Sequence, residues 1–240
     1  MPFEFLLVPG GAFLAALAVG VAGFGDALIA AALWLLVLSP AEAVPLVVST
    51  GLVIHMIPLV RLRRALEFTR LGPFLIGGTL GVPAGSWLLG AADPEVFRTS
   101  VGAFLVVYGL VFLTRRPAGG FAAGGRRLDG AVGVLGGVMG GLAGLSGIVV
   151  TVWAGLRGWP RAEQRGLVQP FILAMHGMAL GWLAAGGMVD AKTGWNFLWC
   201  LPAIALGSWL GLRLYGRLDE RQFQRIVLVM LLVLGAMLLI

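Results

Sequence analysis

The chain has 240 residues, of which 59% are apolar and only 12% are charged, whereas about a quarter of the residues in a soluble domain are charged. This composition excludes an ordinary water-soluble domain and indicates a protein embedded in a lipid bilayer. The formal charge of +6 does not indicate a nucleic-acid partner, because the cations lie in short loops between apolar runs, where they set topology and contact lipid headgroups. A single cysteine and two histidines exclude a disulfide and a thiolate metal cluster and disfavour a zinc site, so we expect no cofactor.

Ten apolar runs follow one another along the chain. Their residues are 5–22, 26–38, 43–60, 71–90, 96–113, 129–145, 147–156, 164–188, 193–215 and 222–240. A helix needs about 20 residues to cross about 30 Å of hydrocarbon. The run 147–156 would reach only about 15 Å as a helix and cannot cross alone.

A glycine-rich stretch, PAGGFAAGG, is the one obvious linker and lies near the middle of the chain. Such composition is typical of a flexible connection. We therefore expect a first membrane repeat at 1–114, a cytoplasmic linker at 115–128 and a second membrane repeat at 129–240.

The two halves resemble each other in sequence. The segment GVAGFGD at Gly20 matches GLAGLSG at Gly141, and GSWL occurs once in each half. The only two histidines, His55 and His176, are also 121 positions apart. Several matches in the same order are stronger evidence than any one of them. Internal repeats are a common construction of transporters, whose substrate site lies at the repeat interface.

The cations decide how the repeats are oriented. If eight segments crossed the membrane in plain alternation, nine cations would face one side and eight the other. If the interrupted segments 5–38 and 129–156 each enter and leave on one side, 15 cations share one face, leaving only Arg98 and Lys192 on the other. Because positive loops favour the cytoplasm, the sequence predicts an all-α polytopic membrane protein with two inverted repeats. Each repeat has one re-entrant helical segment and three full transmembrane helices, and both termini lie outside.

The interrupted segments are rich in glycine, which permits backbone geometry that a Cβ would forbid. Irregular backbone at membrane depth must be buried in protein or line a wet cavity. Each break precedes a short helix whose first N–H groups lack intrahelical acceptors, and two such helix starts could bind an anion. Candidate substrate contacts are therefore Gly23, Gly25, Gly144 and Gly147. The alternative is that these glycines only allow close helix packing.

Polar residues within apolar runs are the other candidates. Asp26 begins the first short helix, where a carboxylate could cap the helix or carry a transported proton. With Asp26, His55 and His176 could relay protons, or be ordinary packed polar residues. Four side chains could donate hydrogen bonds to an oxyanion, although Ser and Thr in membrane helices also bond to nearby carbonyls. They are Ser49, Thr50, Ser146 and Gln169.

The chain resembles the sulfite exporter TauE/SafE family of membrane transporters. The resemblance depends on GVAGFGDALIA and GLAGLSGIVV, on VVSTGL followed by RLRRAL, and on GGTLGVPAGSWL, ALGSWLGLRL and GGMVDAKTGW. Together these segments cover most of the chain. The resemblance implies export of sulfite, sulfonates or related sulfur anions across a bacterial inner membrane.

We therefore expect a secondary transporter rather than an enzyme, with a small anion and the lipid bilayer as its partners and a homodimer as one possible assembly. The mechanism would hold the anion between the two short-helix starts while one half rocks against the other. A passive anion channel is the main alternative. The sequence Gly23-Phe24-Gly25-Asp26 also matches intramembrane aspartyl proteases, but that chemistry needs a second carboxylate, and Asp190 lies near a predicted loop.

Overall fold

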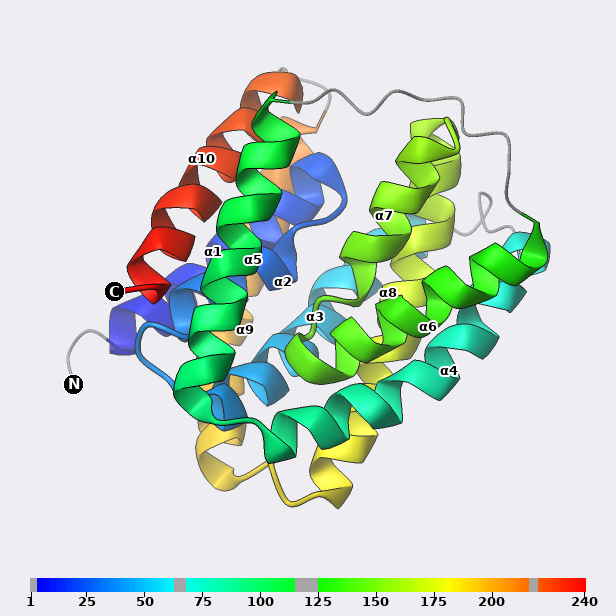
Figure 1. Ribbon diagram of the computed structural model, residues 1–240. Helices are drawn as coiled ribbons and strands as arrows, with labels where there is room; N and C mark the ends of the chain where they lie inside the picture. The colour runs from blue at the N-terminus through cyan, green and yellow to red at the C-terminus, as the bar shows by residue number, and fades with distance from the viewer. Residues whose placement is uncertain (1–3, 63–67, 115–124, 216–219) are drawn as a thin grey trace.

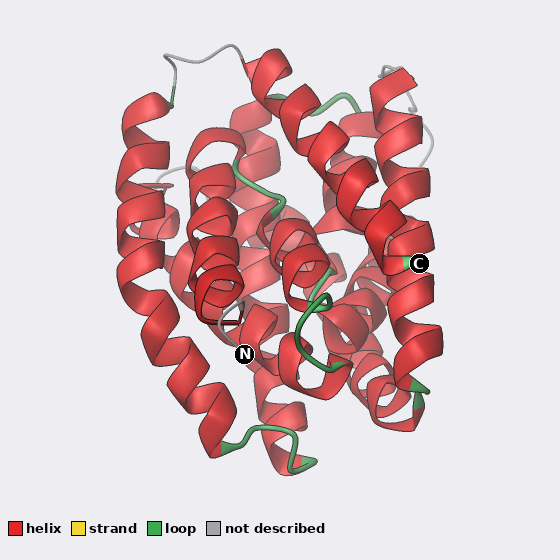
Figure 2. Ribbon diagram, turned by 90° about the vertical axis from the view of Figure 1, so that its left-hand side faces the viewer, coloured by secondary structure: helices red, strands yellow, loops and turns green. Residues whose placement is uncertain are grey.

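The computed structural model describes residues 4–62, 68–114, 125–215 and 220–240, which form ten helices and no strand (Figures 1 and 2). The helices are α1 (Glu4–Ala22), α2 (Asp26–Trp34), α3 (Pro40–Leu62), α4 (Phe68–Ala91), α5 (Pro94–Thr114), α6 (Arg126–Ala143), α7 (Ser146–Leu156), α8 (Arg161–Ala185), α9 (Ala191–Leu214) and α10 (Glu220–Leu238). Each predicted apolar run thus corresponds to one helix. Most of the predicted linker, residues 115–124, lies outside the described residues, and α6 begins inside its last part.

Six helices are long and apolar enough to cross a membrane by length and composition, namely α1, α3, α4, α5, α8 and α9. Large apolar side chains such as Leu6, Leu80 and Trp87 are exposed on the outside of the molecule, which is stable only if lipid covers them. The fold is therefore that of a multi-pass membrane protein. One detail differs from the sequence expectation: α1 reaches spanning length, whereas the apolar part of α10 is confined to Gln222–Leu238.

Both predicted interruptions are present. The chain leaves helical geometry between Ala22 and Asp26 and again between Ala143 and Ser146. The helices that follow are short, with nine residues in α2 and eleven in α7, so each is about 13 to 17 Å long. Neither short helix can span the hydrocarbon core by itself.

Two ion pairs mark opposite ends of the molecule. Glu42 and Lys192, 2.7 Å apart, join the beginnings of α3 and α9. Arg70 and Glu163, 2.6 Å apart, join the beginnings of α4 and α8. Because α4 begins soon after α3 ends, the second pair lies at the end of α3 that is remote from Glu42. Helices α3 and α8 are therefore antiparallel.

The helices pack into two bundles and a pair, and these do not coincide with the halves of the sequence. The first bundle is α1, α2, α3 and α9, and the second bundle is α4, α6, α7 and α8. Each takes three helices from one half of the chain and one from the other. Helices α5 and α10 pack against each other beside the first bundle, and α3 and α8 join the two bundles.

Helices α4 and α9, which each pack in the bundle formed mainly by the other half of the chain, make their contacts through glycine-lined faces. Gly77, Gly81 and Gly85 on α4 lie directly against the backbone of α6, where an added Cβ would collide with backbone atoms. Gly133, Gly137 and Gly141 on α6 face the backbone of α4 in the same way. Without a hydrophobic driving force inside lipid, small residues stabilise helix pairs by letting backbones approach closely. Gly207 and Gly211 on α9 pack similarly on α1.

Candidate functional site

A buried acid and base meet at the first break. Asp26 is the first residue of α2, and its Oδ1 lies 3.1 Å from Nε2 of His55 on α3. The His55 side chain is fully buried and that of Asp26 is 7% exposed. An ionisable pair inside a membrane protein is costly unless its members satisfy each other, and such pairs are typical of proton or ion pathways.

His176 on α8 completes the arrangement from the other bundle. Its ring stands edge-on to that of His55, with centroids 6.3 Å apart. Its Nε2 lies 2.9 Å from the carbonyl oxygen of Gly144, at the second break. A carbonyl can only accept, so Nε2 carries the hydrogen, and Nδ1, which has no hydrogen-bond partner among the described residues, can accept a proton. We call Asp26, His55 and His176 the acid–histidine cluster.

Gly51 on α3 makes room for this cluster. A Cβ at that position would collide with Nδ1 of His176 and would lie 3.3 Å from Oδ2 of Asp26. Any side chain there would displace one of the two groups. The absence of a side chain at Gly51 is therefore what allows a carboxylate of one bundle to approach an imidazole of the other.

The first break depends on backbone geometry that favours glycine. Gly23 and Gly25 have φ angles of 87° and 99°, and no side chain caps α2. The carboxylate of Asp26 pairs with His55 instead of acting as the N-cap. At the second break Gly144 has φ 72°, whereas Gly147 is helical and is needed for space, because its Cβ would meet the side chain of Ile172.

The four predicted hydrogen-bond donors separate into two groups. The hydroxyls of Ser49 and Thr50 each donate to a carbonyl one turn back in α3, both at 2.7 Å. This is the local bonding that competes with substrate contact. In contrast, Oγ of Ser146 and the amide group of Gln169 are buried without a partner among the described residues. Ser146 and Gln169 thus keep their hydrogen-bonding capacity, and Ser49 and Thr50 do not offer free donors.

Little space remains between the two breaks. A pocket of about 10 Å³ is lined by Gly25, Asp26, Gly144, Gly147 and His176, among others. This volume holds at most one water molecule. The structure therefore brings Gly25, Gly144 and Gly147 together, whereas Gly23 lines a separate pocket. In this conformation it leaves no room for an anion between the two helix starts.

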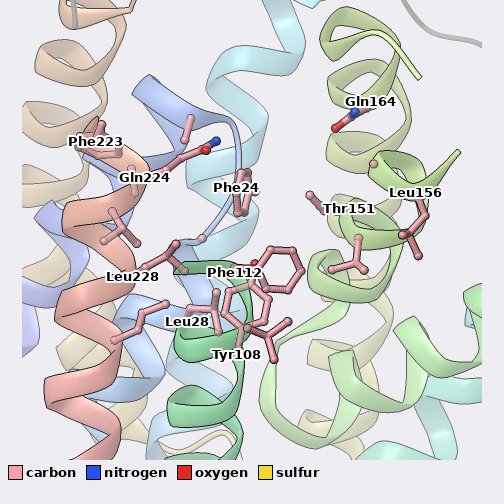
Figure 3. Close-up of a pocket in the computed structure, with 18 residues that line it drawn as sticks. Phe24, Leu28, Tyr108, Phe112, Thr151, Leu156, Gln164, Phe223, Gln224 and Leu228 are labelled. Carbon is pink, nitrogen blue, oxygen red and sulfur yellow. The ribbon is translucent and has the colours of Figure 1, made fainter. Parts of the chain in front are cut away.

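A large cavity lies beside the first break instead (Figure 3). It has a volume of about 920 Å³ and is bounded by α1, the start of α2, α5, α7, α10 and the first turn of α8. Its lining is mostly apolar, with Phe24, Tyr108 and Phe112 pointing into it in Figure 3. Thr151, Gln164 and Gln224 add polar groups. Sequence reasoning missed this cavity, because its walls come from five separate segments of the chain.

The groups around Asp26 exclude an intramembrane aspartyl protease on chemical grounds. The groups beside Asp26 are two histidines, and the other aspartate considered, Asp190, caps α9. Its Oδ1 accepts hydrogen bonds from the backbone N–H and hydroxyl of Thr193, at 2.7 and 2.8 Å. These bonds hold the pKa of the Asp190 carboxyl below its usual range. An aspartate so engaged does not share a proton with Asp26.

Interrupted helices, a buried acid–histidine cluster and a large cavity near it are features of membrane transporters. The sulfite exporter TauE/SafE family model matches residues 8–238, nearly the whole chain, so the protein belongs to the sulfite exporter TauE/SafE family and is not an enzyme. No curated protein and no solved structure matches the chain.

Proposed function

We propose that the protein is a secondary transporter that exports a small sulfur oxyanion, such as sulfite or an organosulfonate, across the bacterial inner membrane by alternating access. The observation that carries this proposal is the cavity of about 920 Å³, which ends at Phe24, Gly25 and Leu28, the residues that it shares with the small pocket lined by Asp26 and His176. A channel would need a continuous pathway past this point. The pocket between the breaks, about 10 Å³ in volume, is too small to provide one.

The cavity supports access from the cytoplasm. It reaches Leu156 at the end of α7, Gln164 at the beginning of α8 and Phe223 at the beginning of α10. These helix ends flank the arginine-rich segments that the positive-inside rule assigns to the cytoplasm. With the N-terminus and C-terminus outside, the conformation is inward-facing.

The two short helices differ in a way that supports alternation. Helix α2 packs against both α5 and α10, whereas α7, its counterpart in the second half, makes no comparable contact with either helix in the described chain. The cavity occupies the space between α7 and the α5–α10 pair. In the outward-facing state we expect the reverse: α7 closes on the pair and α2 separates from it.

The moving bodies are then the two bundles, not the halves of the sequence. The acid–histidine cluster lies at their contact, because Asp26 and His55 belong to the first bundle and His176 to the second. A proton that binds there changes the charge between the bundles and can bias their relative position. Export does not require this coupling, since a monoanion leaving a cell at about 100 mV, negative inside, already gains about 2.3 kcal/mol.

Transport in liposomes tests this proposal. Purified protein is reconstituted, and efflux of sulfite, methanesulfonate, sulfate and acetate is followed at several internal concentrations. We expect saturable efflux of at least one sulfur oxyanion, with competition between accepted anions. Flux that rises linearly without saturation would indicate a channel, and no flux of any of the four anions would contradict the proposal.

A cross-link tests the closing movement. Val152 on α7 and Leu228 on α10 line opposite walls of the cavity. Cysteines at both positions, in a chain with Cys200→Ala, should form a disulfide only when α7 approaches α10. We expect oxidation to stop efflux and reduction to restore it, while each single cysteine variant remains active under oxidant. Failure of the disulfide to form would contradict the approach of α7 to α10, and full activity of the cross-linked protein would show that transport does not require the two helices to separate again.

A further inference from the structure

A side pocket at the first break carries a charge that the cavity otherwise lacks. This pocket, about 70 Å³ in volume, adjoins the large cavity and shares Phe24, Thr151, Gln164 and Gln224 with it. Its additional lining includes Gly23 and Arg165. Of the described residues that line either space, Arg165 alone is charged.

Contacts with α1 and with Tyr215 are among those that hold Arg165 in position. Its Nη2 donates a hydrogen bond of 2.9 Å to the carbonyl oxygen of Val21, in the last turn of α1. Its guanidinium carbon lies 4.5 Å from the centre of the Tyr215 ring. A guanidinium has five N–H donors in a planar fork, so holding one carbonyl is compatible with a two-point contact to an oxyanion.

The polar neighbours of Arg165 come from three helices. Oγ1 of Thr151 on α7 is buried without a hydrogen-bond partner among the described residues. Nε2 of Gln164 on α8 donates to the carbonyl oxygen of Trp159 at 2.8 Å, which fixes the orientation of that amide. Gln224 approaches from α10 on the opposite wall (Figure 3). These groups surround a space large enough for the head of a small oxyanion.

Charge decides where an anion in the cavity would go. Transfer of an anion from water into an apolar environment is strongly unfavourable unless a cation and hydrogen-bond donors replace its hydration. The apolar walls of the cavity offer neither, and the acid–histidine cluster contains a carboxylate. The side pocket combines a fixed guanidinium with hydroxyl and amide groups.

We propose that Arg165, together with Thr151, Gln164 and Gln224, forms the site that binds the oxyanion head of the substrate in the inward-facing state. This inference rests on the proposed function and names the place where the cargo binds. Because a Cβ at Gly23 would lie 2.7 Å from Nε of Arg165, the guanidinium also touches the first break. An anion bound to Arg165 therefore lies close to the backbone of Gly23, which precedes Asp26 in the chain.

Binding measurements on variants test the site. The probes are sulfite and methanesulfonate, titrated into protein in nanodiscs by calorimetry, with affinity corrected for the folded fraction. Hydrogen bonds to a charged group contribute about 1.5 to 3 kcal/mol, so Arg165→Gln should weaken binding of at least one probe roughly 10- to 100-fold. Thr151→Val and Gln224→Leu should weaken it by roughly three- to tenfold.

Arg213→Gln is the matched control. Arg213 also stacks on an aromatic ring, with its guanidinium carbon 4.0 Å from the centre of Trp209, but it does not line the cavity or the side pocket. We expect less than a twofold change in affinity for this variant. A similar loss of affinity in Arg213→Gln and Arg165→Gln would mean that the anion responds only to the overall positive charge and would contradict a site at Arg165.

The outcomes separate this inference from the proposed function. If the wild-type protein transports and binds a probe but Arg165→Gln keeps wild-type affinity, the site is wrong and the transporter proposal stands. If Arg165→Gln does not fold, Thr151→Val and Gln224→Leu decide, since neither touches Val21, and unchanged affinity in both overturns the site. If the wild-type protein neither transports nor binds either probe, both proposals fail.

Discussion

The two helix breaks occupy corresponding positions in the chain, yet only the first is followed directly by an ionisable side chain, that of Asp26. At the first break Asp26 faces Gly51 on the neighbouring long helix. The equivalent positions 121 residues later hold Gly147 and Ile172, which also face each other. In both places a residue without a side chain lies opposite a residue with one, so the packed volume is similar while the chemistry differs.

The sequence predicts an internal repeat, and this difference suggests that a few contacting residues are enough to give one of two similar breaks a charged group. The acid–histidine cluster uses one histidine from each half, but only the first half provides a carboxylate and the space for it. The second break contributes a carbonyl oxygen, that of Gly144, to the same cluster. Of the two breaks, only the first therefore carries a carboxylate, and the following substitutions test what this carboxylate does.

The largest effect is expected for Gly51→Ile, which places in the first half the residue that the second half has at this position. Its side chain would overlap the places of His176 and Asp26, so we expect loss of efflux and a destabilisation of about 1 to 3 kcal/mol. Gly177→Ala is the control, because its Cβ would meet only Leu52 Cδ2 at 3.9 Å. Efflux and thermal unfolding measure both; normal efflux in Gly51→Ile would show that the cluster has no part in transport.

Asp26→Asn should have the next largest effect and should act on transport more than on folding. The amide keeps the size of the carboxylate but cannot hold the charge that pairs with His55. We expect any pH dependence of efflux to flatten while the folded fraction is preserved. Efflux measured as a function of pH decides the matter, and an unchanged pH profile would make Asp26 a structural partner of His55 only.

Smaller effects should distinguish the glycines of the two breaks. Gly147→Ala meets the flexible end of Ile172, whose Cδ1 would be the atom nearest to the new Cβ, and we expect a loss of about 1 kcal/mol that Ile172→Val partly relieves by removing Cδ1. Gly25→Ala has open space around its Cβ but φ 99°, which costs about 1 kcal/mol or more. No neighbouring substitution should relieve that cost, whereas Gly25→Asn should be milder than Gly25→Ala. Thermal unfolding of these variants and of the double variant measures the difference; equal rescue at both sites would contradict it.

The smallest effects should come from Glu42→Gln and Glu163→Gln, which remove the ion pairs at the two ends. Both pairs are partly exposed, and such pairs contribute about 0 to 1 kcal/mol. We expect similar small losses of stability for the two variants, decreasing with salt. A loss above about 2 kcal/mol for either one would mean that its end of the molecule is held mainly by this contact.

Much of the fold could be predicted from the sequence because lipid imposes a simple rule on length and hydropathy. All ten apolar runs became helices, and both glycine-rich interruptions became breaks. The orientation of the repeats and the side of each loop remain predictions. What the sequence could not reveal was the exchange of α4 and α9 between bundles, because glycine faces at a spacing of four residues do not specify which other helix they contact.

The site was predictable only in part. Asp26, His55 and His176 were chosen for polarity inside apolar runs and for their spacing, and they lie together. The roles of Gly51 and Ile172 could not be foreseen, since each depends on what it faces on another helix. Arg165 was counted as one more loop cation, because nothing in its neighbourhood along the chain indicates a cavity that is assembled from five segments.

The glycine-packed contacts also constrain how the protein is assembled. Helix α1 is made first, and α9, whose glycine face packs on α1, follows almost at the end of synthesis. Until α9 has been made, α1 lacks the helix that packs closely on its backbone. In the same way, α4 lacks its close partner until α6 has been made. Neither half can complete a bundle alone. If the chain were cut between Thr114 and Gly125 and the two pieces were expressed together, we expect each piece to be degraded without its partner and both to accumulate as a complex.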